Sequence, residues 1–468
     1  MGVLRLAVPV ALLLWFVWKA RLNALFLLGI PLLMLMGGSV FFENVKVFSK
    51  PGRFDPSTLM MVWLTFTWLV TVARRSRAPG GDEVGLFGPS RILPEELPLF
   101  GIAALVGVHM LGSFGTSGDL GNAAYLASGT FYLIAGYVLV RGIASRATRA
   151  ETNEFLAAVV IANTLACGLF VLHQGLHIPI YLGQANITYT AAGVDITRAT
   201  VFAPALNLLA LGYVLAKRRW TFWWVVVLVV TLAAILVSLT RTLVIAALIG
   251  VVIAIIAREL SRPDFTRVAR RVGAILIGAV VVVVGFSRIT PSYWHFLLKR
   301  LSEFTQSSQA GTQVHDWHLR VLHWGLTERV VSRGDIFFGL GFTHPGQVTV
   351  NPNYVHWTSD MTWLPIMYMF GFVGLILVAL LVGGFIARSL ALSLKPPEQR
   401  RELTLAYFIT LVLTLIMAFQ MWTFMQPSTY PMDLWIFAFI AVESLRPAEE
   451  VAAAGARATR DAGELVAS

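Results

Sequence analysis

Charged side chains are scarce in this chain: Lys, Arg, Asp and Glu make up 13% of its 468 residues, whereas hydrophobic residues make up 57%. Soluble proteins carry about 25% charged residues, so the composition excludes an ordinary soluble domain and predicts a membrane protein. Cysteine is almost missing as well. The single cysteine, Cys167, excludes an internal disulfide framework and therefore says little about the redox compartment.

Acidic residues are fewer than basic ones, with 25 Asp+Glu against 36 Lys+Arg and a net charge of +11. In a soluble protein such an excess would suggest nucleic acid as a partner. No zinc-finger or basic-helix pattern supports that interpretation, and the basic residues fall in short clusters between apolar runs. We therefore expect no nucleic-acid partner, and we interpret the clusters as topology signals and contacts for anionic membrane lipids.

Long apolar runs dominate the sequence. A membrane-spanning helix needs about 20 apolar residues, and runs that approach this length lie at 5–18, 22–41, 57–73, 98–113, 123–140, 154–173, 200–216, 220–239, 242–257, 272–287, 361–387, 403–421 and 431–445. The pattern predicts an all-α fold, a polytopic transmembrane helical bundle of about 12–13 helices. The predicted parts are transmembrane helices over 1–287, a large outer-face loop over 288–360, C-terminal transmembrane helices over 361–445 and a cytoplasmic tail over 446–468.

Basic clusters stand at every second connection between these runs: Lys19/Arg21, Arg74/Arg75/Arg77, Arg141/Arg146/Arg149, Lys217/Arg218/Arg219, Arg258–Arg271 and Arg388–Arg401. The positive-inside rule places all of them in the cytoplasm, with the mixed connection Glu43–Asp55 as a partial exception on the other side. The run 220–257 then forms a hairpin whose turn lies on the outer face. Its only charge, Arg241, is expected at the outer membrane boundary, where the side chain can reach water.

Three segments fall on the predicted outer face: the connection 174–199, the turn 238–241 and the loop 288–360. A loop of this length inside a compact bundle is usually either functional or disordered. Its segment GTQVHDWHLRVLHWGLTERVVSRG interleaves apolar with basic residues, which predicts short amphipathic helices on the membrane surface.

Three local patterns resemble the O-antigen ligase and O-antigen polymerase superfamily of bacterial membrane glycosyltransferases, which are GT-C-like. They are TRATVFAPALNLLA (Thr197–Ala210), SLTRTL (Ser238–Leu243), and the outer loop with LRVLHWGL (Leu319–Leu326) and FFGLGF (Phe337–Phe342) ahead of a helix start, TSDMTWLPIMYMFGFVG (Thr358–Gly374). Each motif is short, but the order and spacing of all three match the family over residues 195–380.

The resemblance implies an enzyme of polysaccharide biosynthesis in the bacterial cytoplasmic (inner) membrane, with its active site on the periplasmic face and 288–360 as its catalytic loop. The donor would be a glycan on a polyprenyl diphosphate such as undecaprenyl diphosphate. We expect an O-antigen or exopolysaccharide polymerase, for which the acceptor is a glycan. The alternative is an O-antigen ligase, for which the acceptor is lipid A-core. By the same resemblance Arg241 and Arg320 bind the lipid diphosphate, and Arg198 assists them or holds the outer loop.

The family's catalytic histidine precedes a glycine of the following helix at a fixed spacing. Counted back from Gly371, that position holds Asp360, and the nearest histidine is His356 in VNPNYVHWTSD. A local insertion could bring His356 into place, Asp360 could take the role, or the protein could work without a dedicated base. We favour His356 and keep Asp360 as the second catalytic candidate.

Elementary chemistry favours the same residue types. Arginine stays charged and matches phosphate oxygens with a planar fork of donors, so converging arginines can stabilise a diphosphate leaving group as a divalent cation does elsewhere. The outer segments contain no DxD motif or carboxylate cluster, and we therefore expect neither a metal nor another cofactor. A histidine suits the activation of an acceptor hydroxyl, and a single displacement would invert the anomeric carbon.

Each candidate residue also has a purely structural interpretation. Arg241 could anchor a helix end, Arg198 could pair with Asp195, and Arg320 could contact lipid headgroups. His356 could be an ordinary loop histidine. The sequence leaves these alternatives open.

Two further possibilities are less favoured. His173 with His177, and His315 with His318, have the spacing of metal ligands but lack a third ligand in register. A transporter or flippase for a lipid-linked glycan would be expected to carry ionisable residues near the helix midplanes and to contain internal repeats. The helix centres here are nearly uncharged and no repeat is seen, which favours an enzyme.

Overall fold

The structure is a computed structural model that describes residues 2–36, 56–75, 87, 91–117, 120–176, 185–191, 194–199, 204–238, 241–259, 336–339, 341, 363–418 and 434–446, with isolated positions between 273 and 298. Its helices are α1 (Gly2–Lys19), α2 (Phe26–Met36), α4 (Pro56–Arg75), the 3-10 helix η3 (Pro94–Glu96), α5 (Leu97–Ser117), α6 (Leu120–Ala144), α7 (Arg149–Leu176), α8 (Pro204–Ala216), α9 (Phe222–Val237), α10 (Arg241–Glu259), α14 (Trp363–Ser393) and α15 (Glu398–Ala418). A last helix covers 434–446.

The predicted helical architecture is confirmed for the residues described. Every predicted apolar run overlaps one of these helices except 272–287, most of which lies outside the described residues. The structure also contains two strands, β1 (Ala185–Ala191) and β2 (Val194–Ala199), which the sequence analysis did not predict. Most of the outer loop 288–360 and all of the tail beyond residue 446 fall outside the described residues.

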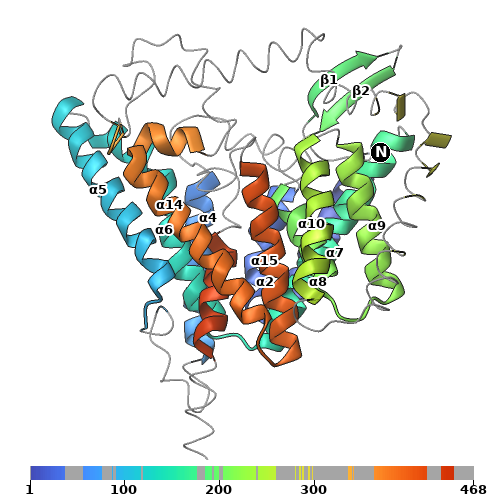
Figure 1. Cartoon of the computed structure of the whole chain (residues 1–468), viewed down its shortest axis with the longest axis horizontal. Helices are drawn as coiled ribbons and strands as arrows, with labels where there is room; N and C mark the ends of the chain where they lie inside the picture. The colour runs from blue at the N-terminus through green and yellow to red at the C-terminus, as the bar shows by residue number, and fades with distance from the viewer. Residues whose placement is uncertain are drawn as a thin grey trace, which may run out of the picture.

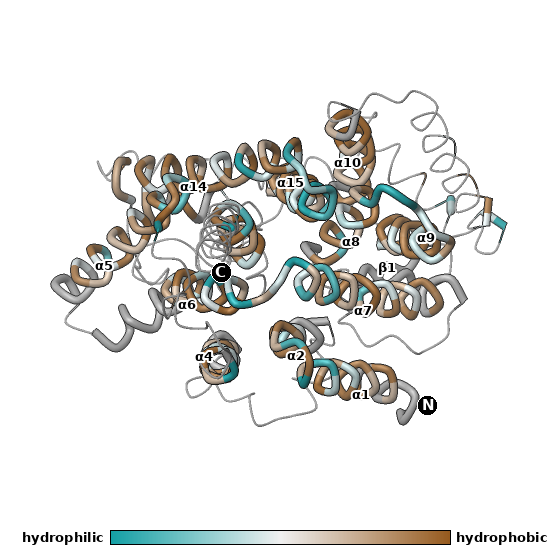
Figure 2. The backbone as a smooth tube through the Cα atoms, turned by 90° about the horizontal axis from the view of Figure 1, so that it is seen from below, coloured by the Kyte–Doolittle hydropathy of each residue, from teal (hydrophilic) through white to brown (hydrophobic). Residues whose placement is uncertain are grey.

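Four of the described helices are long and apolar enough to cross a membrane, over Pro94–Gly112, Arg149–Leu172, Met369–Ser393 and Glu398–Ala418. Large apolar side chains also cover the outside of the bundle. On α10, Leu248, Val252 and Ile256 follow one another at one-turn spacing and are all more than half exposed. Contact with water would cost such a surface about 25 cal/mol per Å², so helices that are apolar outside as well as inside fit a lipid environment. Figure 2 shows this hydrophobic character along most of the helices.

The helix 434–446 packs at the centre of the bundle, and nearly all of its residues are buried. Its aromatic side chains stack on the neighbouring helices: Phe437 lies 4.7 Å from Phe385 of α14, and Phe439 lies 6.1 Å from Tyr407 of α15, both measured between ring centroids. Aromatic pairs of this kind contribute about 0.5–1.5 kcal/mol beyond the burial of their area. The stacks hold α14 and α15 against the central helix.

Close approach of backbones joins α15 to α8 and α10. A Cβ atom on Gly212 of α8 would lie 2.7 Å from Oγ1 of Thr410, and one on Gly250 of α10 would lie 2.6 Å from Cδ2 of Leu413. Small residues permit such crossings in lipid, where packing replaces the hydrophobic effect as the main source of helix association. The glycines therefore allow α8, α10 and α15 to form one closely packed unit.

The basic connections gather at one end of the bundle, which we name the basic end. It comprises the α1–α2, α6–α7, α8–α9 and α14–α15 connections, the end of α4 and the end of helix 434–446 (Figure 1, bottom). Figure 2 looks onto this end and shows hydrophilic residues at the connections. Ion pairs join its parts: Lys19 Nζ to Glu154 Oε1 at 2.7 Å, Lys217 Nζ to Glu402 Oε2 at 3.3 Å, and Arg388 Nη2 to Glu95 Oε1 at 2.6 Å.

Lys217 illustrates how these ion pairs are embedded. It follows the last residue of α8, and its amine lies 4.3 Å from the centroid of the Tyr213 ring and 3.0 Å from Oδ1 of Asn153. Burial lowers the pKa of the Lys217 amine, and the carboxylate of Glu402 acts in the opposite direction. The contact therefore connects three helices, α7, α8 and α15, at one point.

Two carboxylates at the basic end are almost completely buried. Glu443, with 1% of its side chain exposed, accepts from Nε of Arg149 at 2.9 Å and also pairs with Arg446. Glu96, with 4% exposed, lies 2.8 Å from Nε of Arg141 and accepts from the hydroxyl of Tyr137 at 2.5 Å. A buried charge is tolerated only with such partners, so each carboxylate fixes the relative position of the helix ends that meet around it.

Replacement of Glu443 by alanine should lower stability by about 3–5 kcal/mol, because two largely buried guanidinium groups would lose their partner. Thermal unfolding of the purified protein in detergent measures the loss. Glu398→Ala is the matched control. Its carboxylate is 39% exposed and lies 3.9 Å from Arg218, so the change should cost only about 0–1 kcal/mol. Equal losses in the two variants would contradict the role given to Glu443.

Candidate functional site

The candidate site lies at the end of the bundle opposite the basic end. α8 and α10 pack against each other, and both begin at this end, because both finish at or near basic connections. α14 also begins here and runs to the basic end, where it is followed by α15. Strands β1 and β2 lie above the starts of α8 and α10 (Figure 1, top). The described elements that carry parts of the family-like motifs, β2, α8, α10 and α14, therefore share one end of the bundle.

The two strands form an antiparallel hairpin. Its sequences, ANITYTA and VDITRA, are rich in β-branched residues, and Gly193 stands in the connection between them. The alternation of Thr and Ile with other residues is the sequence signal for these strands, and neither strand forms an apolar run of the kind that predicts a membrane helix. The hairpin ends five residues before Pro204, at which α8 begins.

Arg198 belongs to β2, where its backbone pairs with Ile187. Asp195 pairs with Thr190 and stands three positions before Arg198 on the same strand. The register is given for the backbones of both residues, and the Asp195–Arg198 ion pair that the sequence left open stays a hypothesis.

Arg241 is the first residue of α10. The preceding helix, α9, ends at Ser238, whose buried hydroxyl donates to the carbonyl of Ile235 at 2.7 Å. The first N–H groups of a helix lack intrahelical partners and carry the positive end of the helix dipole. A cation there is unfavourable by itself, whereas an anion bound by the arginine and the helix start together is stabilised. The local arrangement is thus suited to an anion such as a phosphate.

The segment 336–341, which contains most of FFGLGF, fills a break in α14. The carbonyl of Ile336 accepts from the N–H of Phe372 at 2.9 Å, and that of Phe337 accepts from the N–H of Val373 at 3.0 Å. In return the N–H of Gly341 donates to the carbonyl of Met369 at 3.0 Å. Backbone groups released by a helix break must find partners where water is excluded, and this segment supplies them.

Gly371 makes the break possible. Its φ of 61° and ψ of −159° lie in a region that is almost restricted to glycine. The segment approaches so closely that a Cβ atom on Gly339 would lie 2.6 Å from the nitrogen of Gly371, and one on Gly341 would lie 2.6 Å from Nδ1 of His109 on α5. Two of the predicted motif pieces, FFGLGF and the helix that contains Gly371, are therefore in direct contact.

The structure gives the backbone position of two predicted site residues and not of the others. Arg198 in β2 and Arg241 at the start of α10 belong to elements at the same end of the bundle. Arg320, His356 and Asp360 lie outside the described residues, and their roles stay predictions. Sequence reasoning missed the break in α14, although Gly371 and the FFGLGF glycines were its visible signal.

Metal ligands do not gather in the part of the chain whose side chains the structure describes: no group there contains three or more His, Cys, Asp or Glu residues placed to hold an ion. The pairs His173/His177 and His315/His318 fall outside that part. The absence of a metal from the glycosyl transfer expected from the sequence therefore stays a prediction.

Replacement of Gly371 by alanine should cost about 1–3 kcal/mol through backbone strain. It should also release 336–341 from α14, because the added carbon meets the backbone of Phe337. Thermal unfolding together with protease cleavage around 336–341 measures both effects. Gly383→Ala on the same helix is the control: no atom lies within 4 Å of the new carbon, and alanine favours a helix interior. Similar behaviour of the two variants would refute the role of Gly371.

Comparison of the chain with protein-family models and with curated proteins finds no match in either case.

Proposed function

We propose that the protein is a metal-independent, inverting membrane glycosyltransferase that moves a glycan from a polyprenyl diphosphate to an acceptor, acting as a polysaccharide polymerase. The bundle would have about 12–13 spanning helices and sit in a bacterial cytoplasmic membrane, with the basic end inside and the 288–360 loop on the periplasmic side. The observation that carries the proposal is the placement of three motif-bearing elements, β2, the start of α10 and the broken α14, at one end of the bundle.

The chemistry of the leaving group supports the choice of donor. Breaking a glycosyl–diphosphate bond leaves negative charge on the β-phosphate, and this charge must be stabilised as it develops. Arg241 is the first residue of α10, and in the proposed site its guanidinium would bind the diphosphate together with the first N–H groups of the helix. Arg320 would bring a second guanidinium from the outer loop. Together they would take the part that a divalent cation has in other transferases.

The acceptor hydroxyl needs a base that is unprotonated near neutral pH. His356 fits this requirement best, since the ordinary pKa of histidine lies near neutrality. Asp360 is the second candidate. Both precede Trp363, the first residue of α14, and would enter the site from the same side as the loop.

The distribution of charge argues against a transporter. Asp, Glu, Lys and Arg residues in the described helices stand in or near the first and last turns, while the buried polar residues farther inside, such as Asn163, Asn207 and Thr231, are uncharged. Transporters commonly hold ionisable groups near the membrane midplane. Among the described helices, no Asp, Glu, Lys or Arg stands in a helix centre, and His109 of α5 is an ionisable residue that does.

The orientation can be tested with single cysteines. Cys167 is buried and its thiol donates to Oδ1 of Asn207 at 3.0 Å, so Cys167→Ser should preserve the fold. In that background, Asn186→Cys in β1 should react with a membrane-impermeant maleimide in spheroplasts. Arg218→Cys at the basic end should react only after the membrane is opened. The reverse pattern would show that the basic end lies outside.

The transfer reaction can be tested with the purified protein, a polyprenyl-diphosphate glycan and EDTA. Lengthened glycans are expected without added metal, and Arg241→Ala and Arg320→Ala should each lower the rate at least about 100-fold, as removal of one transition-state donor does elsewhere. Arg218→Ala is the control, because this exposed arginine lies at the basic end. Strict dependence on a divalent cation, or full activity of both variants, would overturn the mechanism. Product that forms only with lipid A-core as acceptor would identify a ligase instead.

The base is identified by comparing His356→Ala with Asp360→Ala in the same assay. We expect a loss of about 100-fold or more for His356→Ala, in line with general base catalysis, and a small effect for Asp360→Ala. The opposite ranking would assign the base to Asp360, and near-wild-type rates in both would exclude a dedicated base at either position.

A further inference from the structure

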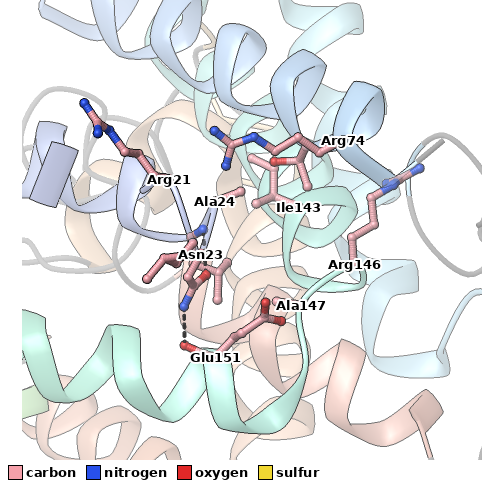
Figure 3. A pocket seen from close by; sticks show the side chains of 11 residues that line it. Arg21, Asn23, Ala24, Arg74, Ile143, Arg146, Ala147 and Glu151 are labelled. Atoms are coloured by element: carbon pink, nitrogen blue, oxygen red, sulfur yellow. Dashed lines mark hydrogen bonds between the residues drawn. The ribbon is translucent and has the colours of Figure 1, made fainter. Parts of the chain in front are cut away.

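A cavity of about 280 Å³ opens at the basic end, far from the elements that carry Arg198 and Arg241. Its wall is made by the α1–α2 connection, the end of α4 and the α6–α7 connection. The polar residues that line it are Arg21, Asn23, Thr71, Arg74, Arg146 and Glu151, and all of them except Thr71 are labelled in Figure 3. Three arginines against one glutamate make this a positively charged cavity.

The acidic residue of the cavity already has a structural role. Glu151 accepts through Oε2 from the N–H of Thr148 at 2.6 Å, and the hydroxyl of Thr148 accepts from the N–H of Glu151 at 3.2 Å. This reciprocal pair is a capping box at the start of α7. The carbonyl of Glu151 also accepts from Nδ2 of Asn23 at 2.9 Å, which fixes the α1–α2 connection beside the cavity. Glu151 therefore holds the wall in place.

Two of the arginines keep donors for a ligand. Arg74 uses Nη1 to donate to the carbonyl of Ala20 at 2.6 Å, one of the five N–H groups that a guanidinium carries. Arg21 is exposed. Among the residues whose side chains are described, neither arginine forms an ion pair with a carboxylate. In Figure 3 the Arg74 guanidinium lies between those of Arg21 and Arg146.

The surface beside the cavity is apolar. Leu22 lines the opening and is 76% exposed, and Trp18 and Leu14 continue an exposed strip along α1. Phe66 and Leu69 expose apolar side chains on α4. Tryptophan is typical of the membrane–water boundary. A ligand with an anionic head and hydrocarbon chains would match both the positively charged cavity and the apolar surface of α1 and α4. A free phosphate would match only the cavity.

We propose that this cavity binds the headgroup of an anionic phospholipid with a phosphodiester, such as phosphatidylglycerol or cardiolipin, whose acyl chains lie along α1 and α4. Basic pockets between membrane helices recognise such headgroups through their phosphates, and arginine forks supply paired donors for phosphate oxygens. The bound lipid joins α1, α4 and the α6–α7 connection.

The experiment uses the full-length protein, delipidated in a neutral detergent, with binding measured by native mass spectrometry and by the shift of the unfolding midpoint. Added ligands are phosphatidylglycerol, phosphatidylcholine, and inorganic phosphate as the free anion. We expect binding of phosphatidylglycerol to be at least about tenfold tighter than that of phosphatidylcholine. The double variant Arg21→Gln/Arg74→Gln should lose about tenfold or more of it, because hydrogen bonds from two charged donors are removed.

The control Arg218→Gln/Arg219→Gln removes the same charge from two exposed arginines of the basic end that do not line the cavity, and it should bind phosphatidylglycerol as the wild type does. If the double variant fails to fold, the single variant Arg21→Gln replaces it, because the side chain of Arg21 is exposed. This single variant should also weaken the binding of phosphatidylglycerol. Equal losses in the two double variants would overturn the site in favour of general surface charge. Midpoint shifts with inorganic phosphate that match those with the lipid would overturn the lipid as its ligand.

Discussion

A charge inside an apolar bundle must either stand at a helix end or meet a partner, and the arrangement of this protein follows from that requirement. Glu443 and Glu96 are nearly inaccessible to water. Glu443 pairs with Arg149 of α7 and with Arg446 of its own helix, and Glu96 pairs with Arg141 of α6. Because a lone buried carboxylate would be costly, these pairs leave few alternative ways to bring the helix ends together. The ion pairs at the basic end therefore set the positions of the helices relative to one another.

Because a helix has a defined length, fixing one of its ends at the basic end also fixes where its other end lies. α8, α10 and α14 finish at or near the basic end, so their starts are presented together at the opposite end. There the regular structure opens: α14 breaks at Gly371, and the carbonyls of Ile336 and Phe337 take the place of the missing helical acceptors. The basic end is joined by ion pairs between helices, whereas at the opposite end the first N–H groups of each helix lack intrahelical acceptors.

Much of the fold could be predicted from the sequence, because apolar length and alternating basic clusters are strong signals in lipid. The partners of those clusters could not. Nothing in the sequence marks Glu96, Glu402 and Glu443 as partners of these clusters, and only the three-dimensional structure shows that they meet arginines or lysines far away in sequence. The hairpin of β1 and β2 was missed for a different reason: its alternation of Thr and Ile is visible, but it is short and sits between apolar runs. The break in α14 depends on a second segment that docks against Gly371. The glycines of both segments are visible in the sequence, but they do not show that the two segments meet. For the candidate site the motifs gave Arg198 and Arg241 a common location, whereas Arg320, His356 and Asp360 remain sequence-based assignments.

The arginines of the basic end differ in what they contact, and this difference separates structural charge from charge that is available to a ligand. Arg141, Arg149 and Arg446 are mostly buried and are matched by carboxylates. Arg21 and Arg74 are exposed and border a cavity whose glutamate serves α7. A positive charge that has no carboxylate partner still repels other positive charges, so the guanidiniums of Arg21 and Arg74 would be stabilised by an external anion. At a boundary between helices and headgroups, the anion present in greatest local amount is the lipid itself.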